Sequence, residues 1–448
     1  MKKLFVETYG CQMNVRDAEE VTGLLLKQGY VRTEVDQDAD VILYNTCSVR
    51  EHAEDRVWSN VGKLRLMKAA RPNLIIGVMG CMAKAQKGKI FKRMPHVDFI
   101  SGPAQLYEVP GIVENIQRSR DGKQAAEAGG GCEAVGTIEK PAAIEEKRRS
   151  EFKTVDYHTS SIQAFITIME GCDKVCSYCI IPYTRGPEVS RPPEQIVEEA
   201  KRLAQAGYKE VMLLGQNVNS YGKRMNGGGT GVTFSKLLEQ VNEIDGIERI
   251  RFITSHPWDA VEDLFEAMRT LPKVCEHLHL PVQSGSDAVL SRMRRNYTAK
   301  DYLGKLALLR SKVPHAVVTT DIIVGFPGET DADFEATLDL VRAARFDGAY
   351  MFKYSPRPYA AASRWEDDVP EKVKDQRLQT LLSLQDRITK EESQKYLFME
   401  VEAMAEEDGM GRARTNRKVY FDGESEPGQL VRVRVEAIRG NSLIGSRI

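Results

Sequence analysis

The sequence predicts an α/β protein of three domains: an N-terminal domain built on a parallel sheet, a partial barrel of six strand–helix units, and a small C-terminal β-barrel. Three observations lead to this prediction. Near the N-terminus short β-rich runs are each followed by a cysteine, in the middle apolar runs alternate with amphipathic helices, and at the end short alternating strands are separated by glycine turns. A chain of 448 residues with 42% hydrophobic content can bury a core in each domain.

The first predicted domain, residues 1–118, repeats one pattern: a β-rich run, a turn that carries a cysteine, and a helical stretch. The three runs and their cysteines are Lys3–Tyr9 with Cys11, Val41–Tyr44 with Cys47, and Leu74–Met79 with Cys81. The carboxyl ends of the strands of a parallel α/β sheet gather at one edge, where ligands bind. The three cysteines are 36 and 34 residues apart, and we expect them to meet at that edge.

Residues 119–157 indicate a linker, because Gly129–Gly131 and the charged run Glu145–Arg149 follow neither the helical nor the strand period. The second domain is expected over 158–385. Its six predicted strands are 163–169, 210–215, 249–254, 276–282, 316–323 and 348–353. Such alternation of strands and helices predicts a parallel barrel or partial barrel, with the functional site at the carboxyl ends of the strands.

The last predicted domain covers 386–448. A long helix over 373–397 leads into it, and from Met399 short alternating strands such as Leu430–Val435 predict a small β-barrel. From residue 409 on, eight basic residues stand against four acidic ones. On composition alone, this basic excess fits a surface for phosphate contacts and a solvated charged turn equally well.

Composition narrows the class of protein. The formal net charge is -1, from 63 basic and 64 acidic residues, so the whole protein is not a general binder of nucleic acid, and any such binding must come from local patches. The N-terminal apolar stretch ends too early for a signal peptide, and no later run approaches the roughly 20 apolar residues of a membrane helix. Eight cysteines are too sparse for a disulfide scaffold. We therefore expect a cytoplasmic protein with no membrane partner.

The strongest chemical motif is a C-x3-C-x2-C run, Cys172, Cys176 and Cys179, directly after the first strand of the predicted barrel. Three thiolates at this spacing can hold three irons of a [4Fe–4S] cube and leave the fourth iron without a protein ligand. Zinc is the alternative. Structural zinc normally takes four ligands, however, and no further His or Cys lies nearby to complete the set.

This motif after the first strand of a βα barrel resembles the radical S-adenosylmethionine (SAM) superfamily, and the whole chain resembles its methylthiotransferases. The matching stretches are Thr8–Asn14, Asn45–Glu51, Gly80–Ala83, Pro182–Gly186, Leu214–Gly222, Thr254–Pro257, Leu280–Ser286 and Asp321–Thr330. The resemblance implies a flavodoxin-like N-terminal domain, a partial (β/α)6 radical SAM barrel and a TRAM domain, which is a small RNA-binding β-barrel. It also implies that the open iron binds SAM and releases a 5′-deoxyadenosyl radical.

The resemblance further implies that Cys11, Cys47 and Cys81 bind a second, auxiliary [4Fe–4S] cluster involved in sulfur insertion. The alternative is three buried cysteines in a flavodoxin-like core, although core packing gives no reason for Cys to recur at the ligand edge of the sheet. Cys132 and Cys275 fall outside both sets and are expected to be no ligands.

Other site residues are expected at the strand ends and in the last domain. Gln216, Ser284 and Glu329 lie at predicted carboxyl ends of barrel strands and are candidates for SAM contacts; alternatively, such residues only shape βα loops and cap helices. In the TRAM-like segment the candidate phosphate contacts are Arg412, Arg414, Arg417 and Lys418, with a solvated charged turn as the alternative.

Within the family, the motifs around Cys11 and at Gly215–Ser220 favour the branch that methylthiolates isopentenyladenosine at position 37 of tRNA. The rivals modify threonylcarbamoyladenosine in tRNA or an aspartate of a ribosomal protein. A rival of another class is a non-catalytic, zinc-stabilised tRNA-binding module, which metal analysis would distinguish. Expected partners are the tRNA anticodon stem-loop and an electron donor such as flavodoxin or ferredoxin, with the enzyme a monomer. Pro187 and Tyr359–Ala362 depart from the family pattern and put local loop geometry in doubt.

Overall fold

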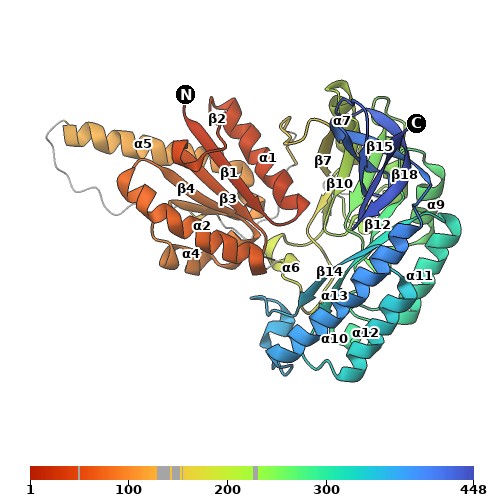
Figure 1. Ribbon diagram of the computed structural model, residues 1–448. Coiled ribbons are helices and arrows are strands. Elements are labelled where there is room, and N and C mark those ends of the chain that lie inside the picture. Colours follow the sequence, from red (N-terminus) through yellow and green to blue (C-terminus); the bar gives the residue numbers. More distant parts are fainter. Residues whose placement is uncertain (49–50, 129–141, 144–151, 154, 226–230) are drawn as a thin grey trace.

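The structure, a computed structural model, describes residues 1–448 except 49–50, 129–141, 144–151, 154 and 226–230, and contains the three predicted domains (Figure 1). The α/β fold class is confirmed: two parallel α/β domains lie side by side and a small closed β-barrel follows. No helix in the described part of the chain is long and apolar enough to cross a bilayer.

The N-terminal domain is a six-stranded parallel sheet in the order β2-β1-β3-β4-β5-β6. Its strands are β1 (Lys3–Tyr9), β2 (Val31–Arg32), β3 (Val41–Thr46), β4 (Ile75–Gly80), β5 (Phe99–Ser101) and β6 (Ala142–Ala143). Its helices are α1 (Gln12–Lys27), α2 (Glu51–Ala70), α3 (Cys81–Ala85), α4 (Lys87–Arg93) and α5 (Val109–Ala128). Separate apolar clusters cover the two faces of the sheet, and β3 and β4 are buried along their whole length. This double cover is why their sequences are continuous apolar runs.

The predicted linker is partly regular structure. Helix α5 continues to Ala128, and β6 adds to the sheet beside β5. The glycine run Gly129–Gly131, Cys132 and the charged run Glu145–Arg149 lie outside the described residues. The prediction that a connecting segment begins at residue 119 was therefore too early by about three helical turns.

The second domain contains six parallel strands close to the predicted ranges: β7 (Gln163–Thr167), β10 (Glu210–Leu214), β11 (Arg249–Ile253), β12 (His277–His279), β13 (Val317–Val324) and β14 (Gly348–Lys353). They form two three-stranded sheets, β11-β10-β7 and β12-β13-β14. Among the described residues no strand ladder joins β14 back to β7, so the barrel is partial, as predicted. A short antiparallel pair, β8 (Met169–Glu170) and β9 (Val189–Ser190), flanks the loop with the cysteine motif.

Amphipathic helices cover the outside of this barrel: α7 (Pro193–Gln205), α8 (Phe234–Asn242), α9 (Glu262–Thr270), α10 (Asp287–Arg292), α11 (Ala299–Lys312) and α12 (Asp331–Ala344). In α8, Phe234, Leu237, Leu238 and Val241 are buried at the helical spacing that the sequence predicts. Together with the strands they form one continuous apolar core. The N-terminal domain lies beside this barrel (Figure 1).

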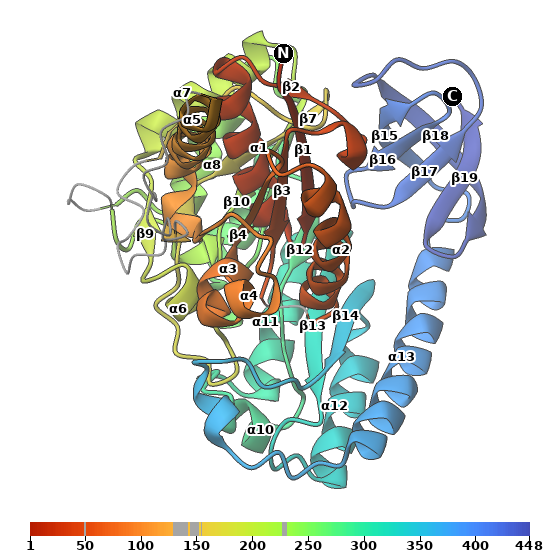
Figure 2. The ribbon, with the colours of Figure 1, turned by 90° about the vertical axis from the view of Figure 1, so that its left-hand side faces the viewer.

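A long helix, α13 (Glu371–Gln394), leads from the barrel to the last domain (Figure 2). It buries Leu381, Leu384 and Ile388 in the barrel core, so the predicted boundary between residues 385 and 386 falls inside a continuous helix. The last domain is a closed barrel in the order β15-β16-β17-β19-β18. Its strands are β15 (Glu400–Glu407), β16 (Met410–Ala413), β17 (Lys418–Phe421), β18 (Leu430–Arg439) and β19 (Ser442–Arg447).

Candidate active site

The structure brings together the three cysteines of the first domain, which we call the N-terminal triplet (Cys11, Cys47 and Cys81). They follow β1, β3 and β4, three neighbouring strands. The Cys47 amide donates to the Tyr9 carbonyl (2.9 Å), and a Cβ added at Gly10 would lie 2.6 Å from the Cys47 Cβ. A hydrogen bond from Cys47, assisted by the nearby Arg185 charge, lowers the pKa of Cys11 to about 5. The three cysteines thus meet at one edge of the sheet, as their spacing predicted, and the lowered pKa favours the thiolate form of Cys11.

A glycine is required immediately before Cys81. Gly80 has φ 92, in the left-handed region, and an added Cβ there would overlap the side chain of Asn45. Asn45 is itself occupied, because its Nδ2 donates to the Asn14 carbonyl (2.7 Å) at the start of α1. The tight packing of these buried groups sets the direction in which the chain leaves β4 and so places Cys81.

The second set, which we call the barrel triplet (Cys172, Cys176 and Cys179), occupies the loop after β8. The loop begins at Gly171, which has φ 78 and lies too close to the Pro187 carbonyl for any side chain. Gln216, a predicted SAM contact, accepts a hydrogen bond from the Gly171 amide through its Oε1 (2.6 Å). The Cys172 amide donates to the Gly186 carbonyl (3.1 Å). Gln216 thus fixes the turn from which the barrel triplet begins.

Burial keeps two of the barrel thiols protonated when no metal is bound: it raises the pKa of Cys172 to about 11 and that of Cys179 to about 12. Metals bind thiolates, so loading this site must release protons. The third thiol, Cys176, has the buried guanidinium of Arg295 at 3.5 Å. A cation at that distance favours a negatively charged ligand set.

Arg185 links the two triplets, and the sequence analysis missed it. From the barrel loop, its guanidinium reaches Asp17 on α1 (2.5 Å) and Glu170 in β8 (3.0 Å), with all three side chains at least 95% buried. Its charge also lowers the pKa of Cys11 and opposes the rise that burial causes in the pKa of Cys81. The only signal in the sequence was its place in the Pro182–Gly186 stretch.

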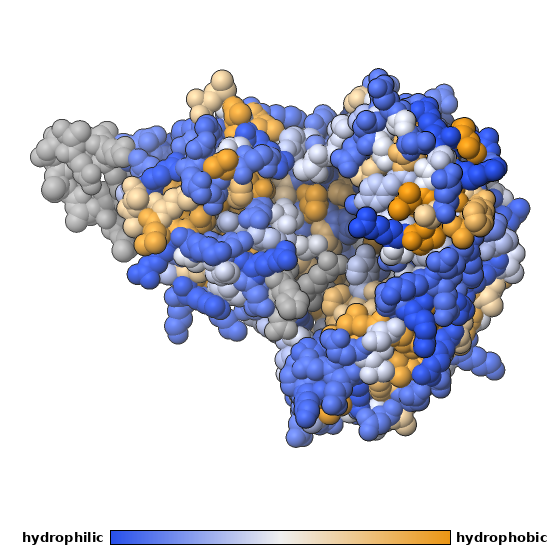
Figure 3. Space-filling view, in the orientation of Figure 1, coloured by the Kyte–Doolittle hydropathy of each residue, from blue (hydrophilic) through white to orange (hydrophobic). Residues whose placement is uncertain are grey.

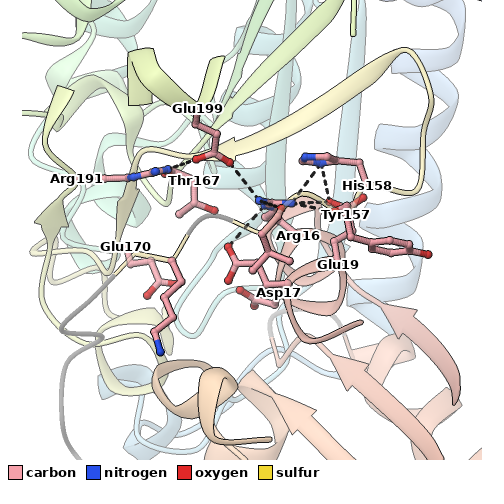
Figure 4. Close-up of polar contacts among 12 residues, drawn as sticks. Arg16, Asp17, Glu19, Tyr157, His158, Thr167, Glu170, Arg191 and Glu199 are labelled. Atoms are coloured by element: carbon pink, nitrogen blue, oxygen red, sulfur yellow. Dashed lines mark hydrogen bonds and ion pairs between the residues drawn. The ribbon is translucent and has the colours of Figure 1, made fainter. Parts of the chain in front are cut away.

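Helix α1 also carries a second buried charge cluster, centred on the neighbouring residue Arg16 and shown in Figure 4. Arg16 donates to Glu199 on α7 (3.2 Å) and to the carbonyls of Val155 and Tyr157 (both 3.1 Å). Glu199 also accepts a hydrogen bond from Arg191. Because these groups come from three segments, the network fixes the N-terminal domain against the barrel. The position of the N-terminal triplet relative to the barrel triplet is thereby fixed.

Comparisons with known proteins agree with this geometry. Family models match at residues 3–102 (Uncharacterized protein family UPF0004), 166–341 (Radical SAM superfamily) and 399–448 (TRAM domain). A tRNA-2-methylthio-N(6)-dimethylallyladenosine synthase of Thermoanaerobacter sp. (strain X514) is 44% identical over 99% of this chain and 92% of the relative. One of Clostridium botulinum (strain Okra / Type B1) is 43% identical over 100% of this chain and 97% of the relative. The chain belongs to this family of radical SAM enzymes.

Solved structures show the same fold at low identity. A radical SAM methyltransferase from Kitasatospora setae, determined with cobalamin and a [4Fe–4S] cluster bound, covers 81% of this chain and 77% of its own, with 14% identity and a TM-score of 0.56. At this identity the likeness shows the fold alone. Membership of the radical SAM superfamily implies a [4Fe–4S] cluster and SAM.

The strand ends of this radical SAM barrel suit a polar cofactor. Buried side-chain atoms without a hydrogen-bond partner among the described residues occur at the carboxyl ends of β7, β10 and β11 or just after them, namely on Thr167, Asn219, Thr254, Ser255 and His256. Native cores rarely leave such atoms unpaired, so a polar ligand at this position would satisfy them. Thr254–Pro257 was among the stretches that match the family, but its individual side chains were not singled out.

The other two predicted SAM contacts are each engaged with a loop amide and with a side chain of the protein. Ser284, fully buried, accepts from the Ser286 amide (3.2 Å) and lies 3.3 Å from the Thr337 hydroxyl. Glu329 accepts from the Gly325 amide (2.6 Å) and from Arg377 (2.8 Å) through the same oxygen. These contacts match the alternative role of shaping βα loops. Whether either residue also contacts SAM stays a prediction.

The ligand roles of both triplets also stay predictions. Within the described residues no group of three or more His, Cys, Asp or Glu side chains is arranged to hold a single metal ion. A zinc site would draw its thiolates to about 2.3 Å from one ion. An iron–sulfur cube instead spreads its ligands over separate irons. Cys275 is buried two residues before β12, as expected for a core residue.

The predicted RNA-contacting arginines lie mostly between the TRAM domain and the barrel. Arg414 pairs with Glu276 (2.7 Å) and donates to the Val274 carbonyl (2.7 Å), immediately before β12. Arg417 is 7% exposed and pairs with Asp347 (3.1 Å). These two guanidinium groups therefore hold domains together.

The remaining two predicted contacts stay at the surface of the TRAM domain. Arg412 pairs with Glu406 (2.8 Å) within that domain, and Lys418 is exposed. Of the four, Lys418 has the placement best suited to a phosphate.

Proposed function

We propose that this chain converts N6-isopentenyladenosine to 2-methylthio-N6-isopentenyladenosine at position 37 of tRNA, using two SAM molecules and an auxiliary [4Fe–4S] cluster. The observation that carries the proposal is similarity over the full length to relatives named tRNA-2-methylthio-N(6)-dimethylallyladenosine synthase. A match that included only the barrel would leave the substrate open, whereas this one includes both triplets and the TRAM domain.

The arrangement of the site supports separate roles for the barrel triplet and the N-terminal triplet. When bound, the barrel cluster and SAM would supply hydrogen abstraction at C2 of adenine, and the auxiliary cluster would supply the methylated sulfur. The barrel triplet would hold the first cluster, and the unpaired polar atoms after β7, β10 and β11 would orient SAM beside it. The N-terminal triplet would hold the second cluster. Arg185 and the network around Arg16 keep the two parts in register, which a transfer between them requires.

The TRAM domain supports an RNA substrate that extends beyond the active site. It docks where β11 and β12 begin, at the opposite end of the strands from the barrel triplet. An RNA bound at both places would therefore run along the barrel, as a stem-loop of several base pairs can. Phosphate contacts at Lys418 and neighbouring exposed cations would position such an RNA without reading its sequence.

The remaining partners follow from the chemistry. Cleavage of SAM needs an electron, so we infer a protein reductant such as flavodoxin or ferredoxin. A single chain supplies both triplets and the TRAM domain, so a monomer is sufficient for the reaction.

The test compares two stem-loop RNAs, one with N6-isopentenyladenosine and one with threonylcarbamoyladenosine at the target position. Anaerobically reconstituted protein, SAM and reductant should give a methylthio nucleoside from the first RNA only, measured by mass spectrometry. A variant with all three cysteines of the N-terminal triplet changed to Ala should still release 5′-deoxyadenosine but form no methylthio product. Product from the second RNA alone would overturn the substrate assignment, and normal product from the variant would overturn the role of the triplet.

A further inference from the structure

An aromatic pair with a strained backbone lies at the surface between the two domains. Tyr359 has φ 69, in the left-handed region that bulky side chains rarely adopt. Its ring is stacked on that of Tyr183, with centroids 3.8 Å apart and planes inclined by 11°. Strain of this kind persists only where the surroundings enforce it, and it gathers at functional sites. The departure of Tyr359–Ala362 from the family pattern is thus an ordered feature rather than a loose loop.

The pair lies between the two triplets. Tyr183 is on α6 (Ile181–Thr184), four residues after Cys179, and α6 packs against α3, the helix that begins with Cys81. The Tyr359 segment is tied to the barrel triplet, because the Ala362 amide donates to the carbonyl of Ser177 (2.7 Å). Figures 1 and 2 both place α6 where the N-terminal domain meets the barrel.

The rings remain accessible: 58% of Tyr359 and 37% of Tyr183 are exposed. The Lys84 ammonium lies 5.7 Å from the Tyr183 ring centroid, on the N-terminal domain. Figure 3 shows the molecular surface hollowed between the lobe of the N-terminal domain and the barrel. Lys84 is itself buried, so the accessible part of this junction is the aromatic pair, and exposed aromatic rings are the kind of surface on which unpaired RNA bases stack.

We propose that Tyr359, supported by Tyr183, is a stacking platform for an unpaired base next to the target adenosine in the RNA loop. The target adenosine must itself enter the barrel to reach the reacting groups. The aromatic pair lies at the surface, so it is placed to stack on the base next to the target. Stacking of that neighbour holds the loop open while the target is splayed from its own stack. The inference rests on the proposed RNA substrate, and Tyr359 acts as a positioning residue.

Three variants separate stacking from a purely structural role. Tyr359→Gly removes the ring and relieves the left-handed backbone, so the melting temperature should stay the same or rise. Tyr359→Phe keeps the ring and should behave as the wild type. Phe398→Gly is the matched backbone control, because Phe398 has φ 64 and is 74% exposed but lies at the junction with the TRAM domain.

The probe is a stem-loop RNA with 2-aminopurine placed in turn on each side of the target. Wild-type protein, Tyr359→Phe and Phe398→Gly should quench the fluorescence of one of the two probes on binding, and Tyr359→Gly should not. Tyr359→Gly should also bind the RNA about 5- to 150-fold more weakly, the range that stacking of one base contributes. Its KM for RNA should rise with little change in kcat.

Equal quenching and affinity in Tyr359→Gly would overturn the proposal and leave the pair as a structural contact. Loss of quenching in Phe398→Gly as well would also overturn it, because the effect would not be specific to the stack. Fluorescence quenching and binding affinity are both measured without turnover. If wild-type protein quenched the probe but formed no methylthio product, the platform would stand and the proposed reaction would fail.

Discussion

Replacing Arg185 with methionine removes a buried positive charge while filling most of its volume. The change leaves Asp17 and Glu170 without their guanidinium partner, and the side chains of both carboxylates are at most 5% exposed. Breaking a buried ion pair from one side costs about 3–5 kcal/mol, because the remaining charge stays desolvated. Since Asp17 belongs to α1 and Glu170 to the barrel, the loss should appear as weakened docking of the N-terminal domain.

Arg342→Met is the matched control. Arg342 also pairs with two carboxylates, Glu335 (2.8 Å) and Asp339 (2.6 Å), but its side chain is 48% exposed on α12. Water screens such pairs, so this change should leave the stability nearly unchanged. A second variant, Arg185→Met with Asp17→Asn, removes one of the two stranded charges. It should recover part of the loss, as expected for residues in direct contact.

Urea unfolding of the full-length protein gives the free-energy differences, and iron per chain after reconstitution reports on the triplets. Arg185→Met should shift the midpoint strongly and retain less iron, because its charge also favours the thiolate forms of Cys11 and Cys81. The reasoning is refuted if Arg185→Met is no less stable than Arg342→Met, or if adding Asp17→Asn makes it worse.

Three further predictions concern the clusters, the TRAM domain and acid stability. Changing the whole barrel triplet to Ala should leave about half of the iron, because the N-terminal triplet holds its own cube; unchanged iron would show that the barrel triplet binds none. Arg417→Met should destabilise the protein by about 3–5 kcal/mol by stranding the buried Asp347, with no change in the salt dependence of tRNA binding. Lys418→Met should leave the stability unchanged but reduce the slope of log K for tRNA binding against log salt by about 0.7–0.9. Filter binding across a salt series distinguishes these two variants. Burial lowers the pKa of His256 from 6.5 to about 2. As the pH falls below 6.5, this imidazole therefore takes up a proton in the unfolded chain but stays neutral in the folded protein. The fold should therefore lose about 2 kcal/mol by pH 5 through this residue, and unfolding curves of His256→Asn, which does not titrate, should show a correspondingly shallower acid dependence; equal slopes would contradict it.

Much of the architecture was predictable because it depends on local patterns. The six barrel strands lie within a few residues of the predicted ranges, since buried parallel strands are apolar runs and their helices repeat with the 3.6-residue period. The meeting of the three N-terminal cysteines followed from the same logic, because equivalent positions after parallel strands must share an edge. The boundary between the barrel and the last domain was predicted less well: it was placed after residue 385, inside α13, whose exposed polar surface continues past that residue with no change of pattern.

The sequence by itself therefore determined the fold class, the family and the grouping of the cysteines, all of which depend on spacing along the chain. Tertiary structure alone decided which polar side chains are free to act. Arg414 and Arg417 belong to a basic stretch that suggested an RNA contact. Carboxylates 138 and 70 residues away in the sequence hold these two side chains between domains. Arg185 pairs with Asp17, which is 168 residues away in the sequence, and Tyr183 stacks on Tyr359 from a different segment of the chain. A charge or a ring has no periodicity that reveals its partner, so its role depends on contacts that exist only after the domains have packed.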